Sequence, residues 1–256
     1  MSLLTINEIQ HTYFTKASTT TALSNVSLKI EEGEFVSFLG PSGCGKTTLL
    51  SIIAGLLKPT QGTVLLENKP LSSKKNDIGY MLQQDYLFPW KTIEENVLLG
   101  LKLSKQLNEK TKSAALQLLK QIGLNGVENQ LPKQLSGGMR QRAALVRTLA
   151  TEPKILMLDE PFSALDYQTK LKLEDLVSKT LKEFKKTAIL VTHDIGEALA
   201  MSDRVFLFSA RPGRLYRTFQ IPDALRKESP FKARNHELYS TLFQTIWKEL
   251  ESLEST

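Results

Sequence analysis

A glycine-rich loop at residues 40–47 carries the clearest chemical signal in this sequence. It reads Gly-Pro-Ser-Gly-Cys-Gly-Lys-Thr, which matches the phosphate-binding pattern G-x-x-x-x-G-K-[ST]. The glycines let backbone N–H groups turn inward around phosphate oxygens, and the start of a following helix adds positive charge. Lys46 is expected to contact the β- and γ-phosphates of a nucleotide, and the Thr47 hydroxyl is expected to hold Mg²⁺. The predicted nucleotide-binding residues of this segment are Gly40, Pro41, Ser42, Gly43, Cys44, Gly45, Lys46, Thr47 and Thr48.

Two adjacent carboxylates, Asp159 and Glu160, end the apolar run Ile-Leu-Met-Leu at residues 155–158. A parallel sheet places the carboxyl ends of its strands beside the ligand. Asp159 could then hold Mg²⁺ directly or through water, and Glu160 could orient and deprotonate an attacking water. Without the phosphate-binding loop, capping of the next segment would be the favoured interpretation of these acids.

A second possible anion site starts within residues 135–141, which read Leu-Ser-Gly-Gly-Met-Arg-Gln. Ser136 fits a helix N-cap, and Gly137 and Gly138 expose backbone N–H groups at the start of a predicted helix. One nucleotide does not need two such cradles. A symmetric dimer does need them, if each phosphate tail lies between the loop of one chain and the Ser136 segment of the other. An ordinary capped helix is the alternative interpretation.

The elements that must position these residues follow from hydrophobic patterning. Short apolar runs predict strands, and apolar residues at helical spacing predict helices. After residue 151 the two kinds alternate, which favours a parallel sheet covered by helices. The predicted strands are residues 3–9, 26–30, 35–39, 63–66, 78–82, 155–158, 188–191 and 205–208, and the predicted helices are residues 46–57, 93–103, 111–122, 137–150, 168–184, 195–201 and 236–253.

Composition limits the class of protein. The 256 residues are 41% hydrophobic, which is enough for one large domain. The longest apolar-rich stretch, residues 49–57, is much shorter than the roughly 20 residues of a membrane-spanning helix, so membrane association is expected through a partner. No signal peptide is predicted, and the lone Cys44 excludes an internal disulfide. The net charge of +6 suits an anionic ligand or an ordinary solvated surface, and without a long basic run we expect no nucleic-acid partner.

Residues 40–47, 135–141 and 158–161, together with His193, resemble the ATPase subunits of ABC transporters in order and spacing. The resemblance covers essentially the whole chain. It implies ATP hydrolysis with ATP and Mg²⁺ and an α/β fold, in which a P-loop NTPase core carries an N-terminal antiparallel β lobe and an inserted helical lobe. The single domain 1–256 would then comprise a nucleotide-binding core with the β lobe (about 1–87 and 151–221), a helical lobe (about 88–150) and a C-terminal helical tail (about 222–256).

Two further site residues are implied by the resemblance alone. Tyr13, which lies 33 residues before Lys46, is similar to the family's aromatic that stacks on adenine; a core tyrosine is the alternative. Gln83 is similar to the family's glutamine that senses the γ-phosphate and Mg²⁺. The spacing from residues 79–82 favours Gln83 over its neighbour Gln84.

The resemblance also assigns roles to a loop and a histidine. Residues 163–166, which end at Asp166, are similar to the family's dimer-communication loop. His193 follows an apolar strand and is similar to the switch histidine that contacts the γ-phosphate. The expected catalytic residues are Lys46, Gln83, Glu160 and His193. The expected metal ligands are Thr47, Gln83 and Asp159. Outside residues 40–48, the expected nucleotide contacts are Tyr13, Ser136, Gly137, Gly138 and Asp166.

The implied partners are a second copy of this chain, integral-membrane permease subunits and, indirectly, an extracytoplasmic solute-binding protein. The protein would then work on the cytoplasmic face of the cell membrane. Residues 135–142, 162–169 and 209–214 resemble importers of nitrate, sulfonates, taurine or thiamine-precursor pyrimidines.

A soluble ABC-type ATPase outside transport is the main alternative, but such proteins usually carry two ATPase units or a long coiled coil. A small-molecule P-loop kinase would have no use for residues 135–138. A nucleotide-sensing module would be expected to lack Glu160 or His193.

Two segments lie outside these motifs. Residues 86–90, Tyr-Leu-Phe-Pro-Trp, form an aromatic, proline-stiffened segment just after Gln83. Exposed aromatic clusters often mark docking surfaces, so this segment is expected to help receive a cytoplasmic helix of the permease. A packed junction between lobes is the alternative. The last predicted helix, residues 236–253, has one apolar face and is expected to pack against its own domain.

Overall fold

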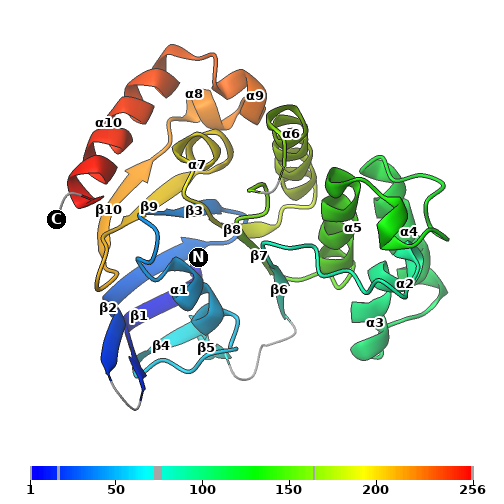
Figure 1. The fold of residues 1–256 in the computed structure, drawn as a ribbon, viewed down its shortest axis with the longest axis horizontal. Coiled ribbons are helices and arrows are strands. Elements are labelled where there is room, and N and C mark those ends of the chain that lie inside the picture. Colours follow the sequence, from blue (N-terminus) through cyan, green and yellow to red (C-terminus); the bar gives the residue numbers. More distant parts are fainter. Residues whose placement is uncertain (1, 16–17, 72–76, 164, 255–256) are drawn as a thin grey trace.

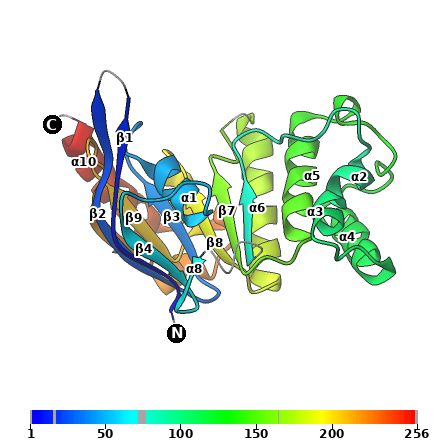
Figure 2. The same ribbon diagram turned by 90° about the horizontal axis from the view of Figure 1, so that it is seen from below.

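The structure is a computed structural model that describes residues 2–15, 18–71, 77–163 and 165–254. Figure 1 shows the order of the elements, and Figure 2 shows their layers. In Figure 2 an antiparallel sheet lies at one end, a larger sheet lies in the middle, and helices from residues 93–149 form a lobe at the other end. This arrangement agrees with the predicted α/β core, N-terminal β lobe and helical lobe.

The antiparallel sheet has the strand order β2-β1-β4-β5. Its strands are β1 (Ser2–Phe14), β2 (Thr19–Glu31), β4 (Gln61–Leu66) and β5 (Lys69–Pro70). The first two are much longer than the predicted runs 3–9 and 26–30. Their outer halves pair around Tyr13 and Thr20 with mostly exposed side chains, so hydrophobic patterning did not mark them.

The larger sheet has the strand order β10-β9-β3-β8-β7-β6. Its parallel strands are β3 (Phe35–Leu39), β6 (Ile78–Met81), β7 (Ile155–Asp159), β8 (Thr187–Val191) and β9 (Arg204–Phe208). The edge strand β10 (Leu215–Gln220) runs antiparallel to β9 and was not predicted, because most of its side chains are exposed. The carboxyl ends of the parallel strands meet at one edge, where ligands bind in such sheets.

Helices cover both faces of the larger sheet. On one face, α1 (Lys46–Ile53) packs between the sheets with Leu49 and Ile53 buried. The prediction that this helix continues to residue 57 is wrong, because Gly55 has a φ of 68° and ends it. The other helices of the core and tail are α6 (Tyr167–Glu183), α7 (Ile195–Met201), α8 (Asp223–Arg226), α9 (Pro230–Ala233) and α10 (Glu237–Glu254). As predicted, α10 packs against its own domain, where Ile246 joins the apolar cluster of α7 and β9.

The helical lobe consists of α2 (Ile93–Val97), α3 (Leu99–Leu103), α4 (Glu109–Gln121), the 3₁₀ turn η3 (Pro132–Gln134) and α5 (Gly137–Leu149). The predicted single helix 93–103 is wrong, because it is divided at Leu98 into α2 and α3. An apolar cluster runs from this lobe into α6 and β7, so the lobe is continuous with the core. Within the described ranges, every helix is too short or too polar to cross a membrane.

Candidate functional site

The phosphate-binding loop lies where the sequence predicted it, between β3 and α1. Gly45 caps α1 with a φ of 91°, a conformation that disfavours residues with a side chain. A Cβ added to Gly45 would lie 2.7 Å from Leu23 Cδ2 and 2.8 Å from the Ala22 carbonyl oxygen. A Cβ added to Gly40 would lie 2.6 Å from the Phe208 carbonyl oxygen. Glycine is therefore required at both positions for the loop to fit against its neighbours.

Lys46 is buried inside this loop. Its ammonium donates hydrogen bonds to the carbonyl oxygens of Gly40 and Pro41, at 2.7 and 3.0 Å. The positive charge is therefore held on two backbone carbonyl oxygens of the loop, and Lys46 is the first residue of α1. A phosphate placed there would meet both the lysine and the helix N-terminus.

Asp159 and Thr47 form a pair of oxygen groups beside the loop. The Thr47 hydroxyl donates to Asp159 Oδ1 at 3.4 Å, and the Tyr80 hydroxyl donates to Asp159 Oδ2 at 3.1 Å. Burial raises the pKa of the Asp159 carboxyl. A hydroxyl with a nearby carboxylate is a donor set that suits Mg²⁺, so these residues fit the ion. Tyr80 was not identified from the sequence, since one tyrosine in a short apolar strand carries no signal.

Glu160 lies between Gln83 and His193. Its Oε1 is 3.2 Å from His193 Nδ1, and its Oε2 accepts from Gln83 Nε2 at 3.4 Å. Gln83 also donates to Ser163 Oγ at 3.2 Å, which ties it to the segment after Glu160. The φ of Glu160 is 46°, a conformation that costs energy in most residues and is often found at functional sites. Two of the predicted catalytic residues, Gln83 and His193, therefore contact a third, Glu160.

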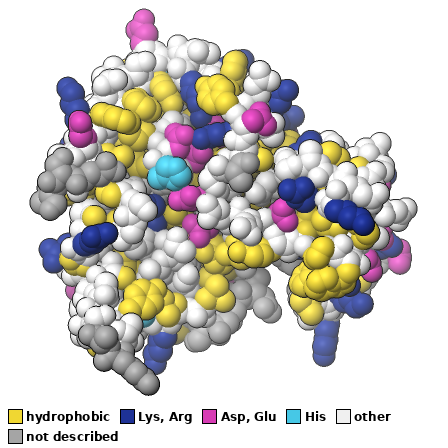
Figure 3. All heavy atoms as spheres, viewed as in Figure 1, with side chains coloured by type: hydrophobic (Ala, Val, Ile, Leu, Met, Phe, Trp, Pro, Cys, Tyr) yellow, Lys and Arg dark blue, Asp and Glu magenta, His cyan; other side chains and the backbone are white. Residues whose placement is uncertain are grey.

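A cavity of about 640 Å³ extends from the phosphate-binding loop to Glu160. Figure 3 shows this side of the molecule, where acidic side chains surround a histidine. Among predicted residues, the lining includes Tyr13, Lys46, Glu160 and His193. Tyr13 is 43% exposed and shares a hydrogen bond of 3.2 Å with Thr48 Oγ1, so the core-tyrosine alternative is wrong. The full lining is Tyr13, Thr19, Thr20, Thr21, Ala22, Ser42, Gly43, Cys44, Gly45, Lys46, Thr47, Thr48, Glu160, His193, Arg211 and Pro212.

The turn at Arg211 and Pro212 also lines this cavity, although no role in the site was predicted for it. It is held against the phosphate loop, because the N–H of Gly213 donates to the Ala22 carbonyl oxygen at 2.9 Å. A Cβ on Gly213 would lie 1.9 Å from the Cys44 carbonyl oxygen, so only glycine fits. The turn is 169 residues from Cys44 along the chain, so no local pattern could have placed it there.

The remaining predicted contacts lie elsewhere. Among the described residues, the cavity lining contains none of Ser136, Gly137, Gly138 and Asp166. Ser136 caps α5 by accepting from the Met139 N–H at 3.3 Å, and Asp166 caps α6 in the same way. Ala164, part of the expected dimer-communication loop, lies outside the described residues. Within one chain, the Ser136 segment is therefore a capped helix that does not face its own phosphate loop.

Helix α5 is bound to the segment that follows Gln83. Gln141 Nε2 donates to the Gln83 carbonyl oxygen at 3.2 Å, and Arg140 Nε pairs with Asp85 Oδ2 at 2.9 Å. Arg147 donates to two further carbonyl oxygens of this segment, those of Asp85 and Tyr86, at 2.7 Å each. Movement of Gln83 would therefore be transmitted to the helix that begins at Ser136.

A buried charge network supports the histidine loop from behind. Asp194 caps α7 by accepting from the N–H groups of residues 196 and 197. Lys170 of α6 pairs with Asp194 and Glu197 at 2.6 Å each. Glu197 also accepts from the Thr192 hydroxyl at 2.5 Å. Residues on both sides of His193 are therefore anchored to α6 and α7, and this network was not predicted, because Lys170 is far from its partners in the chain.

A second buried ion pair, beside this network, predicts a pH dependence of stability. Glu174 is fully buried and pairs with Arg234 at 2.6 Å. Burial raises its pKa from 4.5 to about 7, although Arg234 lowers it in part. The folded protein therefore holds a proton that the unfolded chain releases between these two values, and the resulting stabilisation is lost as pH rises from about 4.5 to 7.

The Glu174→Gln variant tests this pH dependence, because a glutamine side chain does not titrate. Its free energy of unfolding, relative to that of the wild type, should rise as pH increases across this window. Urea unfolding at pH values from about 5 to 8 measures the difference. Glu183→Gln, on the exposed end of the same helix, is the control and should give a flat difference. A flat difference for Glu174→Gln as well would contradict the shifted pKa.

Comparisons with known proteins agree with this geometry. Residues 23–163 match the sequence profile of the family described as ABC transporter. The chain is 62% identical over 254 residues to the uncharacterized ABC transporter ATP-binding protein YtlC of Bacillus subtilis, covering 99% of this chain and 98% of that protein. It is 38% identical over 237 residues to the aliphatic sulfonates import ATP-binding protein SsuB of Bacillus licheniformis, covering 92% and 89%. A dimeric structure of the ATP-binding cassette MJ0796, in a post-hydrolysis state bound to ADP and Pi, superposes with a TM-score of 0.75 at 37% identity, covering 86% of this chain and 99% of that one.

Proposed function

The chain belongs to the ABC transporter family as an ATP-binding subunit with ATPase activity, and we propose that it powers solute import through a separate membrane permease. The proposed solute is a small organic or inorganic anion such as a sulfonate, taurine or nitrate, or else a thiamine-precursor pyrimidine. The similarity to a sulfonate-import ATP-binding protein supports the anion class. The observation that carries the ATPase part is the contact of Glu160 with His193 at the mouth of the phosphate loop.

In the proposed reaction, the loop holds the phosphates of ATP and Lys46 neutralises their charge. Mg²⁺, held by Thr47, Asp159 and Gln83, would supply positive charge to the phosphate oxygens. Glu160 would accept a proton from the attacking water at one carboxylate oxygen. His193 and Gln83 bond to that carboxylate from two sides and would keep it aimed at the water. Tyr13 would stack on the adenine from its exposed position on β1.

The proposed working unit is a homodimer. Ser136, Gly137 and Gly138 begin α5 and do not line the cavity of their own chain, nor does Asp166. Two chains placed face to face could bring these groups to the phosphates held by the partner's loop. The dimeric arrangement of the MJ0796 cassette supports this proposal.

The proposed permease would hold the protein at the cytoplasmic face of the membrane. The test is co-expression with a candidate permease and a candidate solute-binding protein from the same organism, followed by reconstitution into liposomes. We expect co-purification and an ATPase rate stimulated by a binding protein loaded with a sulfonate or another of the named solutes. Failure to co-purify with the permease, together with an ATPase rate that the permease and binding protein do not change, would favour the alternative, a soluble ABC-type ATPase outside transport.

The segment 86–90 is the proposed contact with the permease. Trp90 is 72% exposed and packs edge-on against Phe88, with ring centroids 5.4 Å apart. The buried Asn96 side chain holds the turn beneath them, accepting from the Phe88 N–H at 2.7 Å and donating to the Thr92 carbonyl oxygen at 2.9 Å. Exposed aromatic side chains on a rigid turn favour a docking surface over the packed-junction alternative.

Trp90→Ala is therefore expected to weaken assembly with the permease. A tryptophan at the centre of an interface is worth about 2 kcal/mol or more, which corresponds to roughly 30-fold in affinity. MgATP binding should not change, because Trp90 does not line the nucleotide cavity. Co-purification and transport measure the effect. Trp247→Ala is the control, since Trp247 is 50% exposed on α10, and it should leave assembly intact. Normal assembly of both variants would contradict the docking surface.

A further inference from the structure

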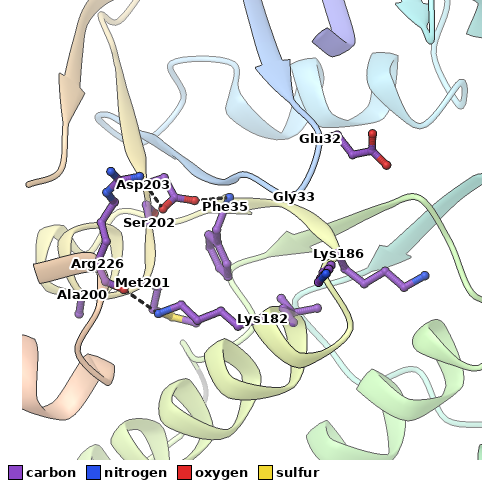
Figure 4. Close-up of a pocket in the computed structure, with 12 residues that line it drawn as sticks. Glu32, Gly33, Phe35, Lys182, Lys186, Ala200, Met201, Ser202, Asp203 and Arg226 are labelled. Carbon is purple, nitrogen blue, oxygen red and sulfur yellow. Dashed lines mark hydrogen bonds and ion pairs between the residues drawn. The ribbon is translucent and has the colours of Figure 1, made fainter. Parts of the chain in front are cut away.

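A second cavity, of about 480 Å³, lies at the edge of the larger sheet opposite the phosphate loop. Phe35, the first residue of β3, lines it, whereas the phosphate loop follows the last residue of the same strand. The rest of the lining comes from the turn before β3, from the carboxyl ends of α6 and α7 with the residues that follow them, and from α8. Figure 4 shows this cavity, with Phe35 between Arg226 on one side and Lys186 on the other. Its size falls within the range of small-molecule sites.

The floor of this cavity is apolar. Phe35, Leu181, Ala200 and Met201 are buried and line it together. An apolar floor of this kind favours contact with hydrocarbon, because that contact removes apolar surface from water. The cavity therefore offers burial to the hydrocarbon part of a ligand.

The rim is basic. Lys182, Lys185, Lys186 and Arg226 line the cavity, against the two acidic residues Glu32 and Asp203. The Asp203 carboxylate is already engaged, since it accepts from the Phe35 N–H at 2.8 Å and pairs with Arg226 at 3.3 Å. The rim therefore carries more positive than negative charge, at the opposite end of β3 from the phosphate loop.

Two of the basic side chains are available to a ligand. Lys182 donates to the Arg226 carbonyl oxygen at 2.8 Å, as Figure 4 shows, and Arg226 pairs with acids. Among the residues that the structure describes, Lys185 and Lys186 form no ion pair. Arg226 Nε is also buried with no hydrogen-bond partner in that part of the chain. An anionic head group could pair with Lys185 and Lys186 while its hydrocarbon part covers the floor.

Two of the elements that meet at this cavity lead directly to the nucleotide site, and a third leads to Asp166, outside the nucleotide cavity of its own chain. β3 connects Phe35 to the phosphate loop, and α7 connects Met201 to Asp194, next to His193. α6 connects the cavity to Asp166 across 17 residues, or about 25 Å. A ligand that shifts these elements would alter groups at their opposite ends.

We propose that this cavity binds an amphipathic organic anion, with its acidic head on Lys185 and Lys186 and its hydrocarbon on Phe35, Leu181 and Met201, and that its occupancy changes the rate of ATP hydrolysis. The ligand chemistry is shared by a free alkyl acid and by the head-group region of an anionic lipid. The nucleotide site is separate from this cavity and lacks its apolar floor.

The first experiment measures binding by isothermal titration calorimetry on the full chain. The probe is octane-1-sulfonate, with sodium sulfate as the head without hydrocarbon and octanol as the hydrocarbon without charge. The double variant Lys185→Gln/Lys186→Gln is expected to bind the probe at least tenfold more weakly than the wild type. Lys172→Gln/Lys179→Gln, two exposed lysines of α6 outside the cavity, is the matched control and should bind normally. Thermal unfolding checks that all variants are folded.

The second experiment separates the two sources of the ligand. Vesicles of phosphatidylglycerol and of phosphatidylcholine are floated with the wild type and with the Lys185/Lys186 double variant. Binding of phosphatidylglycerol vesicles that the double variant loses would support a lipid source, and binding of octane-1-sulfonate alone would support a free anion. In either case the ligand should change the wild-type ATPase rate at least twofold and leave the double variant unaffected, although their basal rates are equal. The proposal is overturned if sulfate or octanol binds as well as the probe, if the double variant binds like the wild type, if the ATPase rate does not respond, or if neither ligand source binds.

Discussion

Glu160→Gln is expected to lower the ATPase rate by about 10²-fold or more while leaving ATP binding intact, because it removes a general base and keeps the shape of the side chain. Glutamine can preserve the contacts with His193 and Gln83, which lie 3.2 and 3.4 Å from the two carboxylate oxygens. It cannot accept the proton of the attacking water. The loss should therefore appear in kcat far more than in the affinity for ATP.

The same variant should accumulate as an ATP-bound dimer. If each ATP lies between the loop of one chain and Ser136 of the other, a nucleotide that is not hydrolysed stabilises the closed state by mass action. Adding Ser136→Arg should abolish this dimer, because a bulky side chain at the start of α5 would block the approach of phosphate. Light scattering with and without MgATP measures the size of each variant.

The control is Glu228→Gln, because Glu228 is an exposed acid outside the nucleotide cavity. This variant should hydrolyse ATP like the wild type and should stay mostly monomeric when purified without a permease. The interpretation that each ATP lies between two chains is wrong if Glu160→Gln stays monomeric at saturating MgATP while the wild type hydrolyses ATP as a monomer.

Lys46→Ala should abolish hydrolysis and weaken MgATP binding. The ammonium lies inside the phosphate loop, on the carbonyl oxygens of Gly40 and Pro41, so it is the charge that a phosphate entering the loop would meet. Removing one preorganised charge contact to a transition state costs about 10²-fold or more in rate. Steady-state ATPase assays and equilibrium binding of a fluorescent ATP analogue measure the two effects.

Folding of this variant should survive, because the lysine side chain adds little to the apolar core. Thermal unfolding checks this point. Lys58→Ala, just beyond α1 and exposed, is the matched control and should keep full activity. Wild-type ATPase activity in a folded Lys46→Ala protein would refute the assignment of residues 40–47 as the site of phosphate binding.

Much of the fold could be predicted because the relevant signals are local. The strand before residue 40, the glycines of the loop and the helix that starts at Lys46 are contiguous, and backbone preferences act over that range. The buried strands β7 and β8 are continuous apolar runs, and their alternation with α6 and α7 indicated a parallel sheet. The order of the motifs was sufficient to indicate the family, which the comparisons confirm.

Element ends and edge strands were less predictable. β10 pairs only with β9 and exposes most of its side chains, so it lacks the apolar pattern that marks a central strand. The helix after the phosphate loop ends near Gly55 and not at residue 57, because glycine adopts a left-handed conformation there. Such outcomes depend on competition between local preference and packing, which a pattern of residue types does not resolve.

The sequence by itself determined which chemistry is available: a phosphate loop, a pair of carboxylates, a histidine and a capped helix with two glycines. Only the tertiary structure decided which of these groups meet. Tyr80 contacts Asp159 because β6 lies beside β7 in register, and Arg211 reaches the phosphate loop because its turn is held on β2. The structure also placed Ser136 outside the cavity of its own chain. These contacts join residues far apart in the sequence, and they depend on strand order and register, which are properties of the whole fold and not of any local run of residues.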